Sequence, residues 1–254
     1  MNNASLLRLI PPVLRARDYH LYPGTSTRLV DLWLDGGKAL LGHKPPKVLG
    51  ELKNSAERGL FSPLPHPQEK HFIKALSRLF PNRSFRAYAD GSSLNRALSH
   101  AAQDVAPLFT WRPFMGNTET LSAYPLIFPV LPWPLAPLAL VLDKELEPQF
   151  PEGDIIPPAI LAATTRAVHN LLASPERGSP KYPKIEKALK TPRHPWKREG
   201  IYLSYGDTID MNFWEALWKQ FLEAGFLLPP TPDDPLILPG TLSQGEETKL
   251  AALL

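Results

Sequence analysis

The sequence contains no cysteine. Disulfide bonds, thiolate metal sites and a cysteine nucleophile are therefore excluded. A secretory leader pattern is also missing, because Pro11 and Pro12 interrupt the apolar start before it reaches the length of a signal-peptide core. We therefore expect a reducing, cytoplasmic location.

The sequence also lacks an uninterrupted hydrophobic helix. Residues 121–142 carry no charge and are numerous enough to cross a bilayer. Five prolines lie within this stretch, and each removes a backbone hydrogen bond that lipid cannot replace. We therefore expect no membrane span, and we interpret the stretch as a buried strand, a proline-rich loop and a second strand at residues 138–142.

A large excess of one charge is absent as well. The 28 Lys and Arg residues and 25 Asp and Glu residues give a net charge of +3, which by itself does not indicate a nucleic-acid partner. One basic stretch, residues 177–198, fits either an anion- or RNA-binding segment or a solvated linker diluted by glutamates. We expect the linker and consider nucleic-acid binding unlikely, keeping it as an alternative.

Proline is abundant instead, at 30 of 254 residues, or about 12% against a usual ~5%. This excess excludes a plain helical bundle or a coiled coil. A hydrophobic fraction of 43% and a charged fraction of 21% are nevertheless typical of a chain with a real core. Several prolines fall where predicted helices begin or end, at Pro46, Pro67, Pro81 and Pro157.

Predicted helices and strands alternate along the chain. Period-two patterns predict strands at residues 84–89 and 200–206. Helical spacing predicts helices at 46–59, 67–80, 92–102, from 157 onward, and at 210–225 behind an Asp210 N-cap. Ser243 and Glu246 predict a capping box that opens a final helix. Strands separated by helices indicate a mixed α/β fold.

Residues 28–98 resemble the amino-terminal part of the class III aminotransferases, including the glutamate-1-semialdehyde aminomutase type. Leu41, Gly42, His43 and Pro46 match the family's Leu-Gly-His-x-x-Pro turn.

A second match lies where a predicted strand leads into a helix. Gly91 and Ser92 match the Gly-Thr of the family loop that cups the phosphate of pyridoxal phosphate. The tail from Tyr202 resembles the family's carboxy-terminal small domain, and the two stretches together cover about half of the chain.

The resemblance implies a fold of the pyridoxal-phosphate-dependent transferase type (fold type I), reduced in size, with a mixed sheet and flanking helices. It also implies cofactor contacts at Gly91, Ser92 and Ser93, with Asp143 as the stand-in for the Asp that pairs with the pyridine nitrogen. The residues alone allow two interpretations of the turn. A helix N-terminus with free N–H groups and hydroxyls suits a phosphate, whereas Asp90 is equally suited to be an ordinary N-cap.

Several parts of the family pattern are missing. No Lys occurs between Lys144 and Lys181, where the family's Schiff-base Lys belongs, and the usual Tyr-His-Gly segment is absent. The resemblance also implies a full-length enzyme well over a hundred residues longer. Lys144 is the remaining candidate for an imine, although its Asp-Lys-Glu context favours a solvated side chain.

We therefore predict a non-catalytic aminotransferase-like protein without a cofactor, which acts by homodimerising or as the partner of a full-length aminotransferase. The alternative is a minimal aminotransferase or aminomutase that binds pyridoxal phosphate through rearranged contacts. The expected organisation is an amino-terminal and phosphate-loop-like region at 1–99, a reduced large-domain remnant at 100–175, a basic linker at 176–200 and a small domain at 201–254.

The remaining constellations are weaker. His66 with His71, and His100 with Asp104, have spacings that could hold a metal, but each pair lacks a third ligand, so we expect capping and surface roles and no metal site. Tryptophans are candidate interface anchors at Trp111 and Trp133. Core packing explains Trp214 and Trp218 better.

Overall fold

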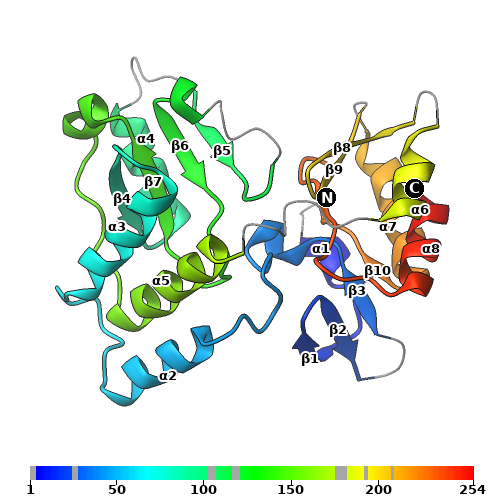
Figure 1. Ribbon diagram of the computed structural model, residues 1–254, viewed down its shortest axis with the longest axis horizontal. Coiled ribbons are helices and arrows are strands. Elements are labelled where there is room, and N and C mark those ends of the chain that lie inside the picture. The colour runs from blue at the N-terminus through cyan, green and yellow to red at the C-terminus, as the bar shows by residue number, and fades with distance from the viewer. Residues whose placement is uncertain are drawn as a thin grey trace. The chain divides into compact units, whose positions relative to one another are not determined.

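The two ends of the chain fold together (Figure 1). The computed structural model describes residues 4–24, 28–101, 107–115, 121–174, 182–191, 194–206 and 209–254. Unit 1 comprises residues 1–44, 114–116 and 176–254, and unit 2 comprises residues 45–113 and 117–175. Residues 1–44 thus belong with the C-terminal region rather than with 45–99, which differs from the four consecutive parts predicted above.

Unit 2 is built on a four-stranded sheet with the order β4-β7-β6-β5. Its strands are β4 (Ser84–Tyr88), β5 (Phe109–Trp111), β6 (Leu126–Pro129) and β7 (Leu138–Leu142). β7 runs antiparallel to β4 and to β6, whereas β5 and β6 are parallel. The charge-free stretch therefore forms two strands joined by a proline-rich loop, as predicted. Within the described residues, no helix has both the length and the hydropathy needed to cross a membrane.

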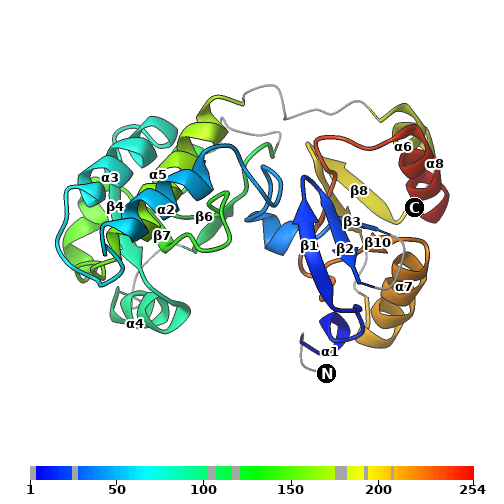
Figure 2. The ribbon, with the colours of Figure 1, turned by 90° about the horizontal axis from the view of Figure 1, so that it is seen from below.

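Side chains that alternate along β7 face two different cores. Ala139 packs with residues of α3 (Gln68–Leu79) and α5 (Pro158–Leu172). Leu140 and Leu142 pack instead with Leu94 and other residues of α4 (Gly91–Ala101). Figure 2 shows the result, with α3 and α5 on one face of the sheet and α4 on the other. The helix α2 (Val48–Glu57) packs against α5.

Prolines open and close the helices of unit 2. Pro67 is the N-cap of α3, and Pro158 is the first residue of α5. Pro46 lies two residues before α2, and Pro81 follows the end of α3. These positions leave intact the hydrogen bonds that a proline inside a helix would remove.

Unit 1 contains two small sheets with the strand orders β1-β2-β3-β10 and β11-β9-β8. Their strands are β1 (Val13–Arg17), β2 (His20–Pro23), β3 (Leu29–Asp31), β8 (Trp196–Glu199), β9 (Tyr202–Tyr205), β10 (Phe226–Leu227) and β11 (Leu236–Ile237). β3 pairs in parallel with β10. The Leu32 N–H donates to Leu227 at 2.9 Å, and the Leu32 carbonyl accepts from Ile237 at 2.7 Å. Backbone pairing therefore joins the two ends of the chain.

The helices of unit 1 are α1 (Ala4–Leu7), α6 (Pro183–Leu189), α7 (Met211–Glu223) and α8 (Gln244–Leu253). The predicted Asp210 N-cap is confirmed, since its carboxylate accepts from the N–H groups of Asn212 and Phe213. Trp214 and Trp218 of α7 are fully buried, and their ring N–H groups donate to the carbonyls of Pro229 and Leu228. Their predicted core role is confirmed.

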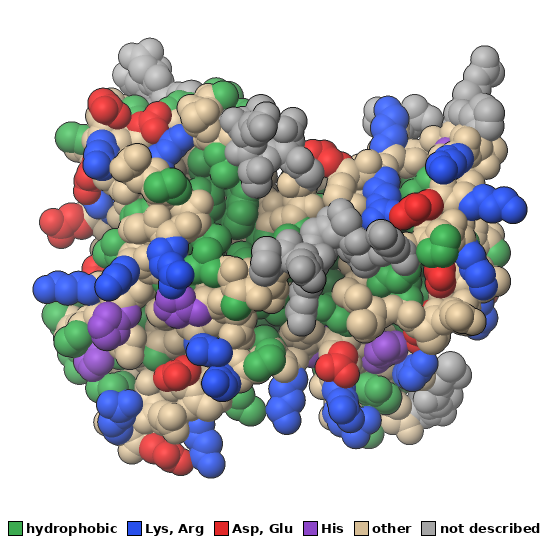
Figure 3. Space-filling view, viewed as in Figure 1, with side chains coloured by type: hydrophobic (Ala, Val, Ile, Leu, Met, Phe, Trp, Pro, Cys, Tyr) green, Lys and Arg blue, Asp and Glu red, His purple; other side chains and the backbone are tan. Residues whose placement is uncertain are grey.

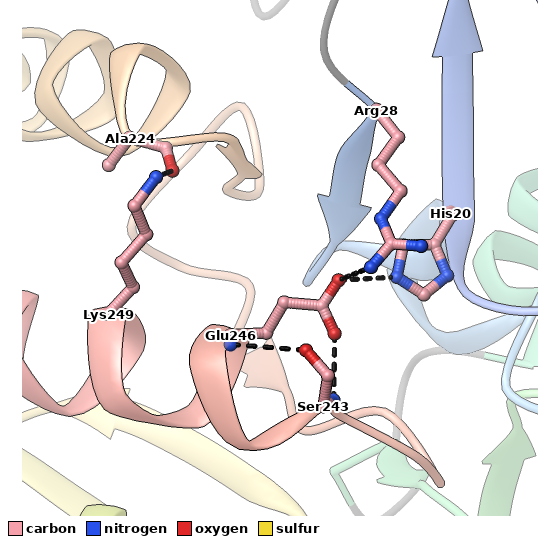
Figure 4. Close-up of polar contacts among 6 residues, drawn as sticks. All are labelled: His20, Arg28, Ala224, Ser243, Glu246 and Lys249. Atoms are coloured by element: carbon pink, nitrogen blue, oxygen red, sulfur yellow. Dashed lines mark hydrogen bonds and ion pairs between the residues drawn. The ribbon is translucent and has the colours of Figure 1, made fainter.

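Glu246 ties α8 to the amino-terminal strands (Figure 4). Its carboxylate lies 2.9 Å from His20 Nε2 and 2.9 Å from an Arg28 guanidinium nitrogen, and it accepts from the Ser243 N–H. The predicted capping box with Ser243 is therefore present. Burial raises the pKa of Glu246, but the hydrogen bonds from Ser243 and His20 outweigh it and lower that pKa to about 2.

The described part of the predicted basic linker, 176–200, is ordered structure rather than a linker. It contains α6 and β8, and it buries Tyr182, Ile185 and Trp196 in unit 1. Glu186 lies 3.4 Å from Arg198. Charged residues dominate the composition of this stretch. The three buried side chains are too few and too far apart to form a clear hydrophobic pattern among them. Residues 175–181 and 192–193 lie outside the described residues.

Candidate functional site

The turn between β4 and α4 is a helix cap. The Asp90 carboxylate accepts the Ser93 N–H at 2.9 Å, which is standard N-cap geometry. The Ser93 hydroxyl accepts from Arg96 at 2.9 Å. A Cβ added at Gly91 would meet no atom within 4 Å, so packing does not require a glycine there. The amino end of α4 therefore already has an anion of its own.

Asp143 and Lys144 follow the end of β7. The Asp143 carboxylate lies 2.5 Å from the Arg83 guanidinium, which also donates to the carbonyls of Leu121 and Tyr124. Lys144 is exposed and begins the 3-10 helix η3 (Lys144–Gln149). Asp143 thus neutralises a structural arginine, and Lys144 faces solvent.

The structure does not bring the predicted cofactor residues together. In the antiparallel pairing of β4 with β7, Ser84 is opposite Leu142 and Tyr88 is opposite Leu138. Gly91–Ser93 therefore follow one end of this strand pair, and Asp143 follows the other. β4 alone spans about 13 Å between its first and last Cα atoms. One cofactor ring and its phosphate cannot contact both groups in the way the resemblance implies.

A second polar centre lies in unit 1, where Asp31 contacts His43. This contact was not predicted from the sequence. Asp31 is almost fully buried, and one of its oxygens accepts the N–H groups of Trp33 and Leu34 at 2.9 and 2.8 Å. The other oxygen lies 3.0 Å from His43 Nε2. Both residues lie within residues 28–98, the stretch that carries the family resemblance. That resemblance is the sequence signal that could have indicated them.

Asp31 supports a strained turn. Leu34, Asp35, Gly36 and Gly37 have φ values of 50°, 51°, 65° and 101°, all in the left-handed region. Non-glycine residues such as Leu34 and Asp35 adopt this region only where the surrounding structure imposes it. Burial raises the pKa of Asp35, and although Lys38 and His43 oppose this effect, Asp31 adds to it.

The backbone conformation at Gly42 explains why the Leu-Gly-His turn has glycine at its middle position. Its φ is +87°, and an added Cβ would lie 3.1 Å from the Asp18 carbonyl oxygen. The next N–H, that of His43, donates to the same carbonyl at 2.8 Å. Glycine permits this approach and the positive φ without strain, and the approach positions His43 beside Asp31.

The outer edge of β4, where the Ala87 carbonyl accepts the Asp154 N–H at 2.8 Å, borders a cavity of about 500 Å³, here called the β4-edge cavity. Its apolar rim includes the exposed side chains Leu64, Ile73 and Ile155. Four carboxylates line it against one guanidinium, that of Arg86, which gives a net charge of −4 + 1 = −3 with His66 neutral. The carboxylates are those of Glu69, Glu147, Glu152 and Asp154.

The walls of this cavity are fixed by specific contacts. Glu147 accepts the Ser84 hydroxyl at 2.5 Å and lies 2.9 Å from Arg86, and these two hydrogen bonds lower the pKa of Glu147. An added Cβ at Gly153 would lie 2.6 Å from the Ala87 carbonyl oxygen, so only glycine fits there. The Asp154 carboxylate accepts the Ala89 N–H at 2.9 Å. The cavity is therefore a preformed acidic and apolar surface.

The weaker candidates have structural roles where they are described. His66 accepts the Gln68 N–H at the start of α3, and His71 lies 3.3 Å from the Gln68 side chain. Asp104 lies outside the described residues. Among the residues that are described, no three His, Asp or Glu side chains are grouped to hold a metal. Trp133 is buried in unit 2.

No protein-family model matches the chain. It is 27% identical to an uncharacterized protein of Treponema pallidum over 288 aligned residues, covering 93% of this chain and 91% of the relative. It is 22% identical to an uncharacterized protein of Borreliella burgdorferi, covering 97% and 91%. The identity to glutamate-1-semialdehyde 2,1-aminomutase of Thermus thermophilus is 33% over 106 residues, which are 41% of this chain but 24% of the aminomutase.

Solved structures match along the whole chain. Ornithine delta-aminotransferase of Plasmodium falciparum has a TM-score of 0.70 at 11% identity, covering 100% of this chain and 97% of that one. A glutamate-1-semialdehyde aminomutase of Pseudomonas aeruginosa, solved in complex with PMP, has a TM-score of 0.68 at 12% identity, covering 95% and 86%. The fold is therefore that of the pyridoxal-phosphate-dependent aminotransferases of fold type I, as predicted. With the partial sequence matches, the chain is a distant relative of the class III aminotransferases, which confirms the resemblance.

Proposed function

We propose that this protein is a non-catalytic member of the aminotransferase-like fold and acts by associating with a second protein chain. The observation that carries the proposal is the separation of Gly91–Ser93 from Asp143 and Lys144 by the length of β4. Catalysis with pyridoxal phosphate requires the cofactor's phosphate, ring nitrogen and imine carbon to be held at once.

The charge at the amino end of α4 supports the same proposal. A helix N-terminus attracts an anion through free N–H groups and the positive end of its dipole. In α4 the Asp90 carboxylate already occupies the Ser93 N–H and supplies negative charge. A phosphate dianion would have to displace this carboxylate against charge repulsion.

The β4-edge cavity is the surface we assign to association. Its exposed Leu64 and Ile155 side chains, 60% and 52% accessible, favour a partner segment with apolar side chains, and its carboxylates favour one with cations. The strand β1 has both features. It is an edge strand in which Leu14 is 78% exposed beside Arg15 and Arg17.

We therefore assign the partner as a second copy of the chain, whose β1 strand binds the β4-edge cavity of the first. A two-fold axis would make this contact twice in one dimer. A full-length aminotransferase is the alternative partner.

An absorbance scan with pyridoxal phosphate tests the loss of catalysis. We expect no saturable internal aldimine band at millimolar cofactor. A band that appears in the wild type and disappears in Lys144→Ala would contradict the proposal and support a minimal pyridoxal-phosphate enzyme. Lys70→Ala is the matched control, because Lys70 is also exposed but lies on α3 and lines neither cavity of unit 2.

Light scattering after size exclusion tests the association. We expect a dimer that dissociates in Ile155→Asp and in Leu14→Asp, because each change puts a charge into the apolar contact. Leu49→Asp is the control, since Leu49 is 58% exposed on α2 and outside both surfaces. A wild-type monomer at tens of micromolar, or a dimer that neither variant weakens, would contradict the assignment. A monomer that binds a purified full-length aminotransferase would favour the alternative partner.

A further inference from the structure

A second cavity of unit 2 lies among three helices and has the opposite charge. It measures about 450 Å³, and we call it the α3–α5 cleft. α2 contributes Glu51. The remaining lining residues come from α3 and α5: Gln68, His71, Lys74, Ala75, Arg78, Ala162, Thr165, Arg166 and His169. Figure 3 shows Lys, Arg and His side chains gathered on this face of unit 2, over these helices.

Helical spacing places the charges on facing sides of the cleft. Lys74 and Arg78 are four residues apart on α3, so they share one face. Arg166 lies one turn before His169 on α5. Ala75 and Ala162 also line the cleft, and their small side chains take up little of its space. The cleft is thus a consequence of alanines at the contact of two helices that carry cations.

The cations of the cleft are not neutralised by the protein. Lys74, Arg78 and Arg166 form no ion pair or side-chain hydrogen bond with any described residue. Three cations against the single carboxylate of Glu51 give a net charge of +3 − 1 = +2 with both histidines neutral.

Arg166 shows the cost of this arrangement most clearly. Its Nε is inaccessible to solvent and has no hydrogen-bond partner in the described structure. A buried unpaired donor of a charged group is unfavourable. The Thr165 hydroxyl beside it donates to the Leu161 carbonyl, which leaves its oxygen able to accept but not to neutralise a cation. An anion in the cleft would instead balance the charge of the guanidinium, which lines it.

The charges of the cleft also affect the pKa of His169. Burial lowers the pKa of His169, and Arg78 and Arg166 lower it further. A bound anion would oppose these effects and favour the imidazolium. The other charged or titratable groups of the cleft are Glu51, His71 and Lys74.

We propose that the α3–α5 cleft binds a small phosphate-bearing anion. Two guanidiniums and an ammonium match the oxygens of phosphate, and arginine binds them in a bidentate manner. Phosphate has its second pKa near 6 and is therefore a dianion above that pH. Three fixed cations beside two imidazoles match the charge of a phosphate dianion better than that of a ligand with a single carboxylate. The volume is within the range of small-molecule sites. This proposal is independent of the association assigned to the β4-edge cavity.

Calorimetric titration at low salt tests the proposal on the full chain with three probes: inorganic phosphate, pyrophosphate and glycerol phosphate. We expect saturable binding that weakens about tenfold or more in Arg166→Gln and in Arg78→Gln. Glu51→Gln is expected to strengthen binding, because it removes the opposing charge. Preference for glycerol phosphate over the inorganic probes would identify a phosphate ester as the ligand, and the reverse preference a free phosphate.

Lys70→Gln is the matched control, because Lys70 is an exposed cation on α3 that does not line the cleft. An NMR titration supplies a second readout, in which the pKa of His169 rises when the probe is bound. Three results would overturn the proposal: no saturable binding at millimolar probe, equal weakening by Lys70→Gln, or an oligonucleotide that binds these same residues more tightly than pyrophosphate.

Discussion

Two carboxylates of unit 1 and one cleft of unit 2 differ in how completely the protein pairs their charged groups. In unit 1, Asp31 has hydrogen-bond partners for both oxygens, and Glu246 contacts His20, Arg28 and Ser243. In the α3–α5 cleft of unit 2, the exposed Lys74 and Arg78 and the partly buried Arg166 lack protein partners among the described residues, and the Nε of Arg166 is buried without an acceptor. Satisfied buried groups stabilise a fold, whereas unsatisfied ones lower stability and point to a ligand. The comparison therefore assigns a structural role to Asp31 and Glu246 of unit 1 and anion binding to the α3–α5 cleft of unit 2.

The largest expected effect is on Asp31. Asp31→Ala should lower the free energy of unfolding of unit 1 by about 4 kcal/mol, because it leaves two buried N–H groups unpaired and a left-handed turn unsupported. Urea unfolding followed by near-ultraviolet circular dichroism measures this. The neighbouring Asp35→Asn is the control and should change stability by less than about 0.5 kcal/mol, since burial already disfavours its charge. Equal effects at both positions would contradict a structural role specific to Asp31.

Glu246 makes the stability of unit 1 dependent on acid pH. Its pKa falls from an ordinary 4.5 to about 2 in the folded protein. A lowered carboxyl pKa contributes stability that is fully present above pH 4.5 and is lost as the pH falls toward 2. The loss should be about 1–2 kcal/mol, because solvent screens this partly exposed cluster, and it is measured by urea unfolding at several pH values. Glu246→Gln should reduce this dependence, whereas the exposed Glu223→Gln should leave it unchanged.

Substitutions at two glycines compare a position that requires glycine with a helix position that does not. Gly42→Ala should destabilise unit 1 by about 2 kcal/mol, because Gly42 has a positive φ and its added Cβ would press on the Asp18 carbonyl. Gly50→Ala in α2 should stabilise unit 2 by about 0.5–1 kcal/mol, since its Cβ meets nothing within 4 Å. Thermal unfolding of both variants measures this contrast, and destabilisation by Gly50→Ala would count against it.

The smallest effect distinguishes binding from stability in the α3–α5 cleft. Arg166→Gln should leave unfolding unchanged or raise its free energy by about 0.5 kcal/mol, because it removes an unpaired cation next to Arg78. Chemical denaturation without added anion measures this. A loss above about 2 kcal/mol would mean that Arg166 holds the helices together, and the comparison between the units would fail.

Local elements were predictable because short-range chemistry determines them. The capping box of Ser243 and Glu246, the Asp210 N-cap and the buried Trp214 and Trp218 each require only neighbouring residues. The helix starts after Pro67 and Pro157 follow from the fixed φ and missing N–H of proline.

Long-range pairing was not predictable from the same patterns. The antiparallel register of β4 with β7, which separates Gly91 from Asp143, joins strands about fifty residues apart. The α3–α5 cleft likewise depends on which helix faces Arg166, and a periodic pattern does not specify a neighbour. The buried Ile185 of α6 was not predicted because the two lysines and the glutamate around it resemble a solvated surface.

The central proposal is that this aminotransferase-like fold does not hold pyridoxal phosphate as a catalytic imine. Borohydride reduction after incubation with the cofactor, followed by peptide mass mapping, tests it most directly, because reduction makes any lysine imine permanent. We expect no lysine to be modified stoichiometrically. One-to-one modification of a single lysine, at Lys144 or elsewhere, with an aldimine absorbance band before reduction, would contradict the account.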